Sequence, residues 1–193
     1  MKIIKVLFLF FLIGIVNNIF AGVILDSLRF DLTTSAYGSP KLKPGVGGGV
    51  AIGVSTRYFN IFLANKAIIS NLNYVDGGAK LLFSGLIRTE LKYKFSNMPF
   101  VALGGFGLGI VSYEGGKDSA SGPLLEISAG PLFTLTQHVS MIGRIYGLLS
   151  KVSKEISISK DPDIRKTIST DISGVGFDVT IRFSFGRTNR LKY

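Results

Sequence analysis

Residues 175–185 read VGFDVTIRFSF, and this stretch decides the fold. Every odd-numbered position in it is apolar: Val175, Phe177, Val179, Ile181, Phe183 and Phe185. Every even-numbered position between them is small or polar: Gly176, Asp178, Thr180, Arg182 and Ser184. Successive side chains of a β-strand point to opposite faces, so this alternation predicts a strand with one apolar and one polar face.

The same two-residue period recurs along the rest of the chain. It is clear in Lys80–Phe95 and less regular in Leu28–Thr33, Gly45–Ser55, Leu125–Leu135 and Val139–Ser150. Phe100–Tyr113 is apolar and glycine-rich on both faces, and Asn60–Ser70 shows the pattern only weakly. After residue 21 no apolar run approaches the length of a membrane-spanning helix. The sequence therefore predicts eight strands.

The connections between these strands alternate in length. Three are tight: Ser55–Phe59, Ser96–Pro99 and Thr136–His138. Four are longer or more polar: Ser35–Pro44, Asn71–Gly78, Glu114–Pro123 and Lys151–Ser173. Short turns on one side and long loops on the other are typical of barrels that cross an outer membrane. We therefore predict an all-β chain, an eight-stranded antiparallel transmembrane β-barrel with an up-and-down meander, over residues 22–193.

The first 21 residues have the composition of a secretory signal peptide. Met1–Lys5 carries two lysines, Val6–Val16 is continuously apolar, and Ala21 offers a small residue for cleavage. We expect residues 1–21 to be removed on export. The mature barrel would then reside in the outer membrane, surrounded by outer-membrane lipid, with both termini in the periplasm.

The two faces of the strands predict opposite environments. The apolar positions of 175–185 are expected to face lipid, and charges on the polar faces are expected to pair inside a narrow lumen. The candidates for this charge network are Arg29, Asp31, Arg88, Glu90, Glu126, Arg144, Asp178 and Arg182. Two aromatic belts are expected at the membrane surfaces: Phe59, Phe95, Phe100, Phe133 and Phe185 at the turns, and Tyr37, Tyr74 and Tyr113 near the loops. A soluble lipocalin-like binding barrel, with its apolar face turned inward, is the alternative.

The chain offers few groups for catalysis. It has no cysteine and a single histidine, His138, which falls in a predicted turn. We therefore predict no catalytic residue, no metal site, no cofactor and no enzyme, and export argues against a nucleic-acid partner. A small outer-membrane enzyme and a narrow pore are kept as alternatives, although eight strands leave an interior that side chains fill.

Residues 22–193 resemble, in architecture, small eight-stranded outer-membrane barrels of the OmpA/OmpX type. Asp178, Phe183 and Phe185 resemble the terminal signal of such proteins, which implies the barrel-assembly machinery as a partner. Thr180 stands where that signal usually has glycine, and eight residues follow Phe185. The Ile-, Asn- and Lys-rich sequence is also similar to that of small spirochaetal surface barrels.

Function is expected in the loops, because recognition residues concentrate on loops that a rigid scaffold carries. We predict a non-enzymatic protein that serves adhesion, host-factor binding or an envelope structural role. The binding candidates are basic residues of the longest connection: Lys151, Lys154, Lys160, Arg165 and Lys166. Their charge suits an extracellular host protein or an acidic polymer. Part of this connection is expected to extend the last hairpin beyond the membrane.

Overall fold

The computed structural model describes residues 27–40, 42–56, 58–70, 80–115, 118–157 and 165–186. These ranges form nine strands: β1 (Ser27–Ser39), β2 (Leu42–Ser55), β3 (Phe59–Ser70), β4 (Lys80–Lys94), β5 (Val101–Gly115), β6 (Asp118–Thr134), β7 (Val139–Ser157), β8 (Arg165–Asp171) and β9 (Gly174–Phe185). Within them no helix is long and apolar enough to cross a membrane. The predicted signal peptide, residues 1–21, lies outside the described residues.

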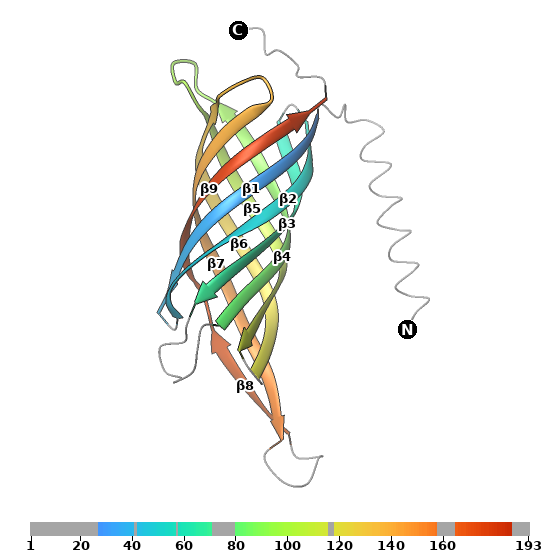
Figure 1. The fold of residues 1–193 in the computed structure, drawn as a ribbon, viewed down its shortest axis with the longest axis vertical. Helices are drawn as coiled ribbons and strands as arrows, with labels where there is room; N and C mark the ends of the chain where they lie inside the picture. The colour runs from blue at the N-terminus through green and yellow to red at the C-terminus, as the bar shows by residue number, and fades with distance from the viewer. Residues whose placement is uncertain are drawn as a thin grey trace, which may run out of the picture.

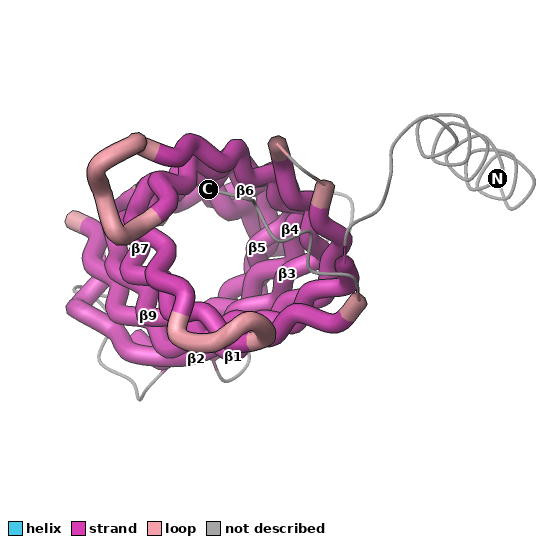
Figure 2. The backbone as a smooth tube through the Cα atoms, turned by 90° about the horizontal axis from the view of Figure 1, so that it is seen from above, coloured by secondary structure: helices cyan, strands magenta, loops and turns pink. Residues whose placement is uncertain are grey.

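Eight of the nine strands close into a barrel (Figures 1 and 2). The strand order is β6-β5-β4-β3-β2-β1-β9-β7, and a further pairing of β6 with β7 completes the circle. All neighbours are antiparallel. The predicted fold class, an eight-stranded antiparallel meander barrel, is confirmed.

The ninth strand, β8, lies outside the barrel wall. β7 pairs with β9 over Val139–Leu148 and then continues beyond the wall, where its residues Lys151–Ser157 pair with β8. Figure 1 shows this β7–β8 hairpin projecting from one end of the barrel. The expected extension of the last hairpin beyond the barrel is therefore present. We call this the loop end, and the opposite end, which holds the start of β1 and the end of β9, the turn end.

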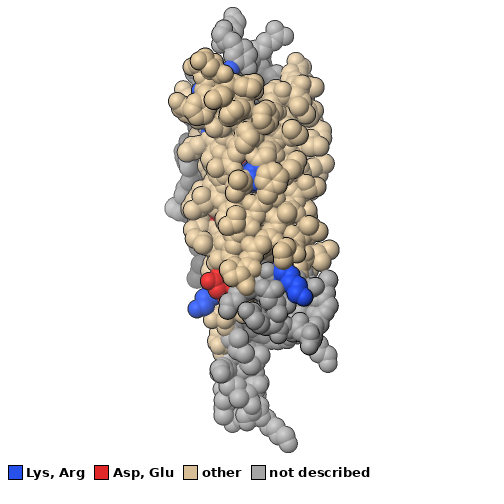
Figure 3. Space-filling view, turned by 90° about the vertical axis from the view of Figure 1, so that its left-hand side faces the viewer, with Lys and Arg blue, Asp and Glu red and all other residues tan. Residues whose placement is uncertain are grey.

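Alternation places the apolar face outside. In β9, Val175 is 62% exposed and Val179 is 40% exposed, whereas Asp178 and Arg182 are completely buried in the interior. Phe183 is half-buried on the outer face, with its ring centroid 6.4 Å from that of Phe30. The face drawn in Figure 3 is almost without charged side chains between its two ends. This arrangement is the reverse of a soluble lipocalin-like barrel, so the structure does not support that alternative.

Two of the four predicted long loops are wrong. β1 and β2 pair up to Ser39 and Leu42, and β5 and β6 pair up to Gly115 and Asp118, so only two residues separate the strands at each place. The predicted loops Ser35–Pro44 and Glu114–Pro123 are mostly strand. These stretches are polar, and polar composition is also typical of loops. A strand that extends past the apolar band can carry polar residues on its outer face, so composition alone predicted loops there.

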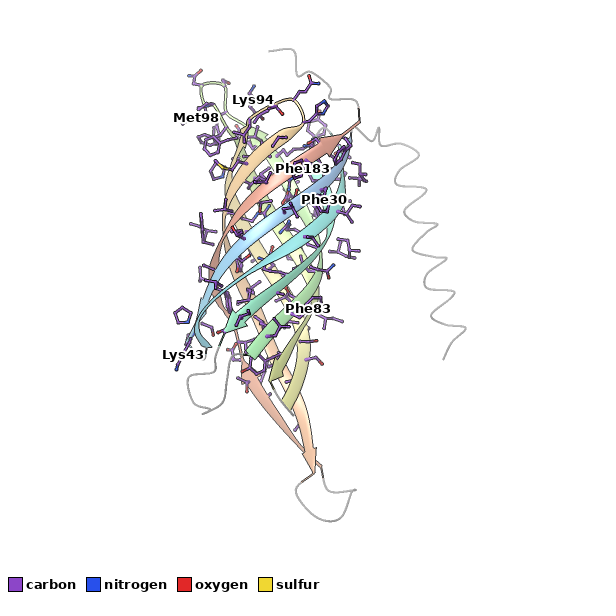
Figure 4. All side chains as sticks on the ribbon, viewed as in Figure 1. Phe30, Lys43, Phe83, Lys94, Met98 and Phe183 are labelled. Carbon is purple, nitrogen blue, oxygen red and sulfur yellow. The ribbon has the colours of Figure 1, made fainter. Side chains whose placement is uncertain are left out.

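Aromatic residues surround the turn end, as predicted. Tyr58 and Tyr93 are exposed near the turns, Tyr93 packs against Phe95 at 4.7 Å between ring centroids, and Phe100 lies 5.8 Å from Phe133. Figure 4 shows Met98 and Lys94 at this end, and Phe83 toward the other.

The predicted tyrosine belt at the loop end is wrong. Tyr37 and Tyr113 are almost completely buried and point into the barrel. Tyr74 lies outside the described residues. A tyrosine at a strand end suits a membrane surface and a closed lumen equally well, so only the phase of the strand could separate these two environments.

Candidate functional site

The middle of the lumen holds eight buried charged side chains. Four are acidic, and four are basic. They come from β1, β3, β4, β6, β7 and β9, and we call them the charge network: Asp31, Lys66, Arg88, Glu90, Glu126, Arg144, Asp178 and Arg182. Each has at most 7% of its side chain exposed. Because acidic and basic residues are equal in number, the network carries no formal net charge.

Glu90 is the centre of the network. Its Oε1 lies 2.6 Å from Arg144 Nη2 and 3.3 Å from Arg88 Nε. Its Oε2 lies 2.8 Å from Arg182 Nη2 and accepts a 3.1 Å hydrogen bond from the Asn60 amide. One carboxylate therefore contacts three guanidinium groups.

Arg182 also joins the first and last strands of the barrel. Its Nε and Nη2 donate to the two carboxylate oxygens of Asp31, each at 2.7 Å. The β1–β9 register places these two residues directly opposite each other. Arg182 further lies over the Phe62 ring, 4.4 Å from its centroid. Paired hydrogen bonds of this kind are among the strongest that side chains form.

The prediction missed one member of the network, Lys66. Its Nζ lies 2.9 Å from Asp178 Oδ2 and 3.7 Å from Glu126 Oε2, and it sits 3.6 Å from the centroid of the Tyr146 ring. Lys66 belongs to β3, the most weakly patterned strand. Its even number was the available signal, because the even positions of β3 face inward.

Arg29, also predicted for the network, lies on the turn side of it. The side chain is half-buried and donates to Ser184 Oγ at 2.6 Å and to Ser55 Oγ at 3.3 Å. The other seven predicted residues lie together in the network through the ion pairs described above and those of Arg88 with Glu126 and Asp31 and of Arg144 with Asp178.

Apolar side chains fill the interior around the charge network and toward both ends of the barrel. A large cluster of inward-facing residues begins at the level of the network, where Phe62 lies opposite Arg88, and extends to the loop end. Its members are Tyr37, Ala51, Phe62, Ala64, Ile68, Leu82, Leu86, Val111, Tyr113, Leu124, Tyr146, Leu148, Val152 and Ile172. On the turn side of the network Leu103, Leu132 and Ile142 form a smaller one. The interior is therefore a packed core of charged and apolar side chains.

A glycine makes room for the largest of these side chains. Tyr146 stacks on Tyr37 with 6.3 Å between ring centroids. A Cβ atom placed on Gly176 would lie only 2.2 Å from Tyr146 Cζ. On the inner face of β9, Gly174 and Gly176 therefore leave space for tyrosine rings, and Asp178 and Arg182 further along supply charges.

A packed lumen predicts the absence of a conductance. We expect planar-bilayer recordings of the purified monomer to show no large, steady current, because the paired charges and the apolar side chains fill the interior. Boiled protein serves as the control for insertion artefacts. A stable nanosiemens channel from folded monomer would contradict the closed lumen.

The predicted binding residues of the last connection are only partly described. Lys151 is exposed at the base of the β7–β8 hairpin, opposite Asp171. Lys154, Arg165 and Lys166 lie on the hairpin backbone, but their side chains are outside the described residues. Lys160 is outside them entirely.

The single histidine lies in the turn between β6 and β7. His138 Nδ1 is 3.1 Å from the carbonyl oxygen of Ser184, and its Nε2 is 2.8 Å from the Gln137 amide. Among the described residues, no group of three or more histidine or acidic side chains is arranged to hold a metal ion.

Comparison with solved structures identifies the architecture. The chain is similar to Neisserial surface protein A, with a TM-score of 0.61, 11% identity, and coverage of 82% of this chain and 96% of that one. It is similar to the outer membrane protein OprG of Pseudomonas aeruginosa (TM-score 0.59, 9% identity, 86% and 98% covered). It is also similar to the N-terminal β-barrel domain of Pseudomonas aeruginosa OprF (0.53, 12%, 83% and 98%). No protein-family model and no curated protein matches the sequence. The resemblance to small eight-stranded outer-membrane barrels is confirmed at the level of the fold.

Proposed function

We propose that this chain is a non-enzymatic outer-membrane barrel that presents its loop end, above all the β7–β8 hairpin, to a partner outside the cell. The projection of this hairpin beyond the barrel wall is the observation that carries the proposal. Under this proposal residues 1–21 direct export, the barrel-assembly machinery inserts the chain, and both termini remain in the periplasm.

The distribution of apolar and charged residues supports the membrane location. Outward-facing Leu, Ile, Val and Phe side chains surround the barrel, and the charges of its middle point inward. Exposing so much apolar surface to water is unfavourable, whereas the hydrocarbon of a membrane is a suitable environment for it. The neighbours in fold are named as surface or outer-membrane proteins, which agrees with this location.

The hairpin has two features of a binding element. β8 ends the strand order, so one of its edges carries backbone N–H and C=O groups that no described strand pairs. An open edge of this kind can accept an extended segment of a partner. The stretch 151–171 also contains five basic residues beside four acidic ones, and the basic residues are the groups that would contact an acidic polymer or an acidic face of a host protein.

Deletion of residues 155–168 tests this assignment. We expect the barrel to assemble normally, because the deletion shortens a connection and leaves every strand of the wall intact. We expect binding to an immobilised sulfated polysaccharide, used as a model acidic polymer, to fall at least about tenfold. Wild-type binding should weaken with added salt, because its contacts are exposed charges.

A matched deletion of residues 72–77, in the β3–β4 connection, serves as the control and should leave binding unchanged. Assembly of both variants is checked by heat-modifiable gel mobility. Equal binding by all three proteins, or failure of the 155–168 variant to assemble, would overturn the assignment to the hairpin.

A further inference from the structure

The outer face of the barrel carries an amide where an apolar side chain is expected. In the strands that the structure describes, Asn65 of β3 is the only residue with a side-chain amide that faces outward. Lys66, the next residue of β3, belongs to the charge network in the middle of the lumen. Asn65 therefore lies near the same depth on the opposite face of the wall, where hydrocarbon surrounds the barrel.

Apolar side chains surround Asn65 on this outer face. Leu63 precedes it on the same face of β3, and Val50 lies directly opposite it on β2. On β4, Phe83 and Ile87 lie on either side of the residue that pairs with Asn65, and Phe83 is labelled in Figure 4. All four of these apolar side chains are exposed. Asn65 is therefore inside the apolar band and not at its edge.

The Asn65 amide makes no hydrogen bond within the part of the chain that the structure describes. Thr34, another polar residue of the outer face, differs from it, because the Thr34 hydroxyl donates to the carbonyl of Val179 at 3.4 Å. Hydrocarbon offers an amide neither a donor nor an acceptor, so leaving it unpaired costs free energy. Polar side chains at this depth usually contact another polar group. The Asn65 amide thus needs a partner from outside the chain.

Small residues beside Asn65 leave its amide accessible to a second protein wall. A Cβ atom placed on Gly85, which pairs with Asn65 on β4, would lie 3.2 Å from Asn65 Oδ1, so the glycine leaves this oxygen uncovered. Ala67 is the next outward-facing residue of β3, and Gly48 lies opposite it on β2. Small residues allow membrane-spanning elements to approach each other closely.

A second copy of the chain offers a matching partner at the right depth. Copies that insert with the same end outward hold Asn65 at the same depth in the membrane. A two-fold axis along the membrane normal then places a residue opposite itself. A side-chain amide contains both a donor and an acceptor. Each Asn65 can therefore donate an N–H to the oxygen of the other.

We propose that the outer face of β2, β3 and β4 around Asn65 is a homodimer interface within the membrane, centred on two reciprocal hydrogen bonds between the Asn65 amides. The exposed apolar side chains around Asn65 pack against those of the second copy. β7 lies four strands from β3 in either direction around the barrel, so both β7–β8 hairpins stay on the outer sides of the dimer. The interface depends on the membrane location and not on what the hairpin binds.

Energy transfer between donor- and acceptor-labelled copies of the folded full-length chain in phosphatidylcholine vesicles tests the interface. The chain has no cysteine, so Asn97→Cys in the exposed β4–β5 turn carries the label. We expect saturable association, which Asn65→Leu weakens at least about tenfold because both hydrogen bonds in lipid are lost. The barrel of this variant should fold normally, as gel mobility can confirm, since Asn65 makes no hydrogen bond within the described chain. Thr34→Val, the control, removes a polar group that already has a partner and should change association less than about twofold.

Spin labels on the outer face locate the contact in the same vesicles. Leu63→Cys on β3 and Ile145→Cys on β7 replace exposed residues on opposite sides of the barrel. Between two copies, the labels at position 145 should be at least about 20 Å farther apart than those at position 63, because the widths of both barrels separate them. The proposal is overturned if the wild-type chain stays monomeric at every protein-to-lipid ratio, if Asn65→Leu associates as tightly as wild type, or if the labels at position 145 are the closer pair.

Discussion

Replacing Glu90 by Gln should lower the free energy of unfolding by about 3–5 kcal/mol, the range found when one partner of a buried ion pair is removed. Glu90 contacts the guanidinium groups of Arg88, Arg144 and Arg182 within 3.3 Å. The neutral amide leaves these three cations with too few carboxylates in a medium that water does not reach. Urea unfolding in lipid vesicles, followed by gel mobility because the chain has no tryptophan, measures the change.

Asp171→Asn provides the control for Glu90→Gln. Asp171 is an exposed carboxylate in β8, beyond the barrel wall, where water screens its interactions. We expect its replacement to cost less than about 1 kcal/mol. A cost below 1 kcal/mol at Glu90 as well would show that the charge network does not stabilise the barrel.

Replacing Val179 by Arg should cost about 2–4 kcal/mol, the penalty for arginine on the lipid face at the bilayer midplane. Val179 is on the outer face in the middle of β9, opposite Thr34 and Gly143. A long side chain can reach water only from near a membrane surface, so the penalty depends on depth. The measurement is again unfolding in vesicles.

Val175→Arg is the matched variant, on the same face of the same strand but four residues nearer the loop end. We expect a cost of about 0–1 kcal/mol there. If the two substitutions cost the same, β9 does not cross a bilayer in this register. Both variants lose a valine that is at least 40% exposed, so the packing lost is small at each position.

The strand pattern predicted most of the fold because barrel strands have two environments that differ sharply. In β9 every odd position is apolar and every even position is small or polar. This alternation predicted that the segment is a strand, which of its residues face outward, and where it ends. For β5 the sequence did not show which face is inward, because its inward positions include Gly105, Gly107 and Gly109, which carry no side chain. Pairing with β4 and β6 decides its orientation, and pairing is a property of the whole barrel.

The charge network could be predicted only as a set of candidates. Alternation assigned Arg88 and Glu90 to one face of one strand, but partners such as Asp31 and Arg182 are brought together by the register between β1 and β9. Lys66 was missed because β3 is the most weakly patterned strand. Arg29 and Lys92, which both donate to Ser55 Oγ, could not be grouped from the sequence, since they come from different strands, β1 and β4.

The seam between β1 and β9 also has a consequence for the order of assembly. Asp31 and Arg182, which form the two 2.7 Å hydrogen bonds across it, are 151 positions apart in the chain. Asp178, which Lys66 and Ser35 contact, belongs to the same last strand. Until β9 arrives, Asp31 and Glu90 each lack their contact with Arg182, and Lys66 lacks its contact with Asp178, so an open sheet would leave these charges less completely paired. Insertion of one strand at a time would therefore bring incompletely paired charges into lipid, which is unfavourable. If the barrel instead closes in water or inside a shielding partner and then enters the lipid, the charges pair before they reach it.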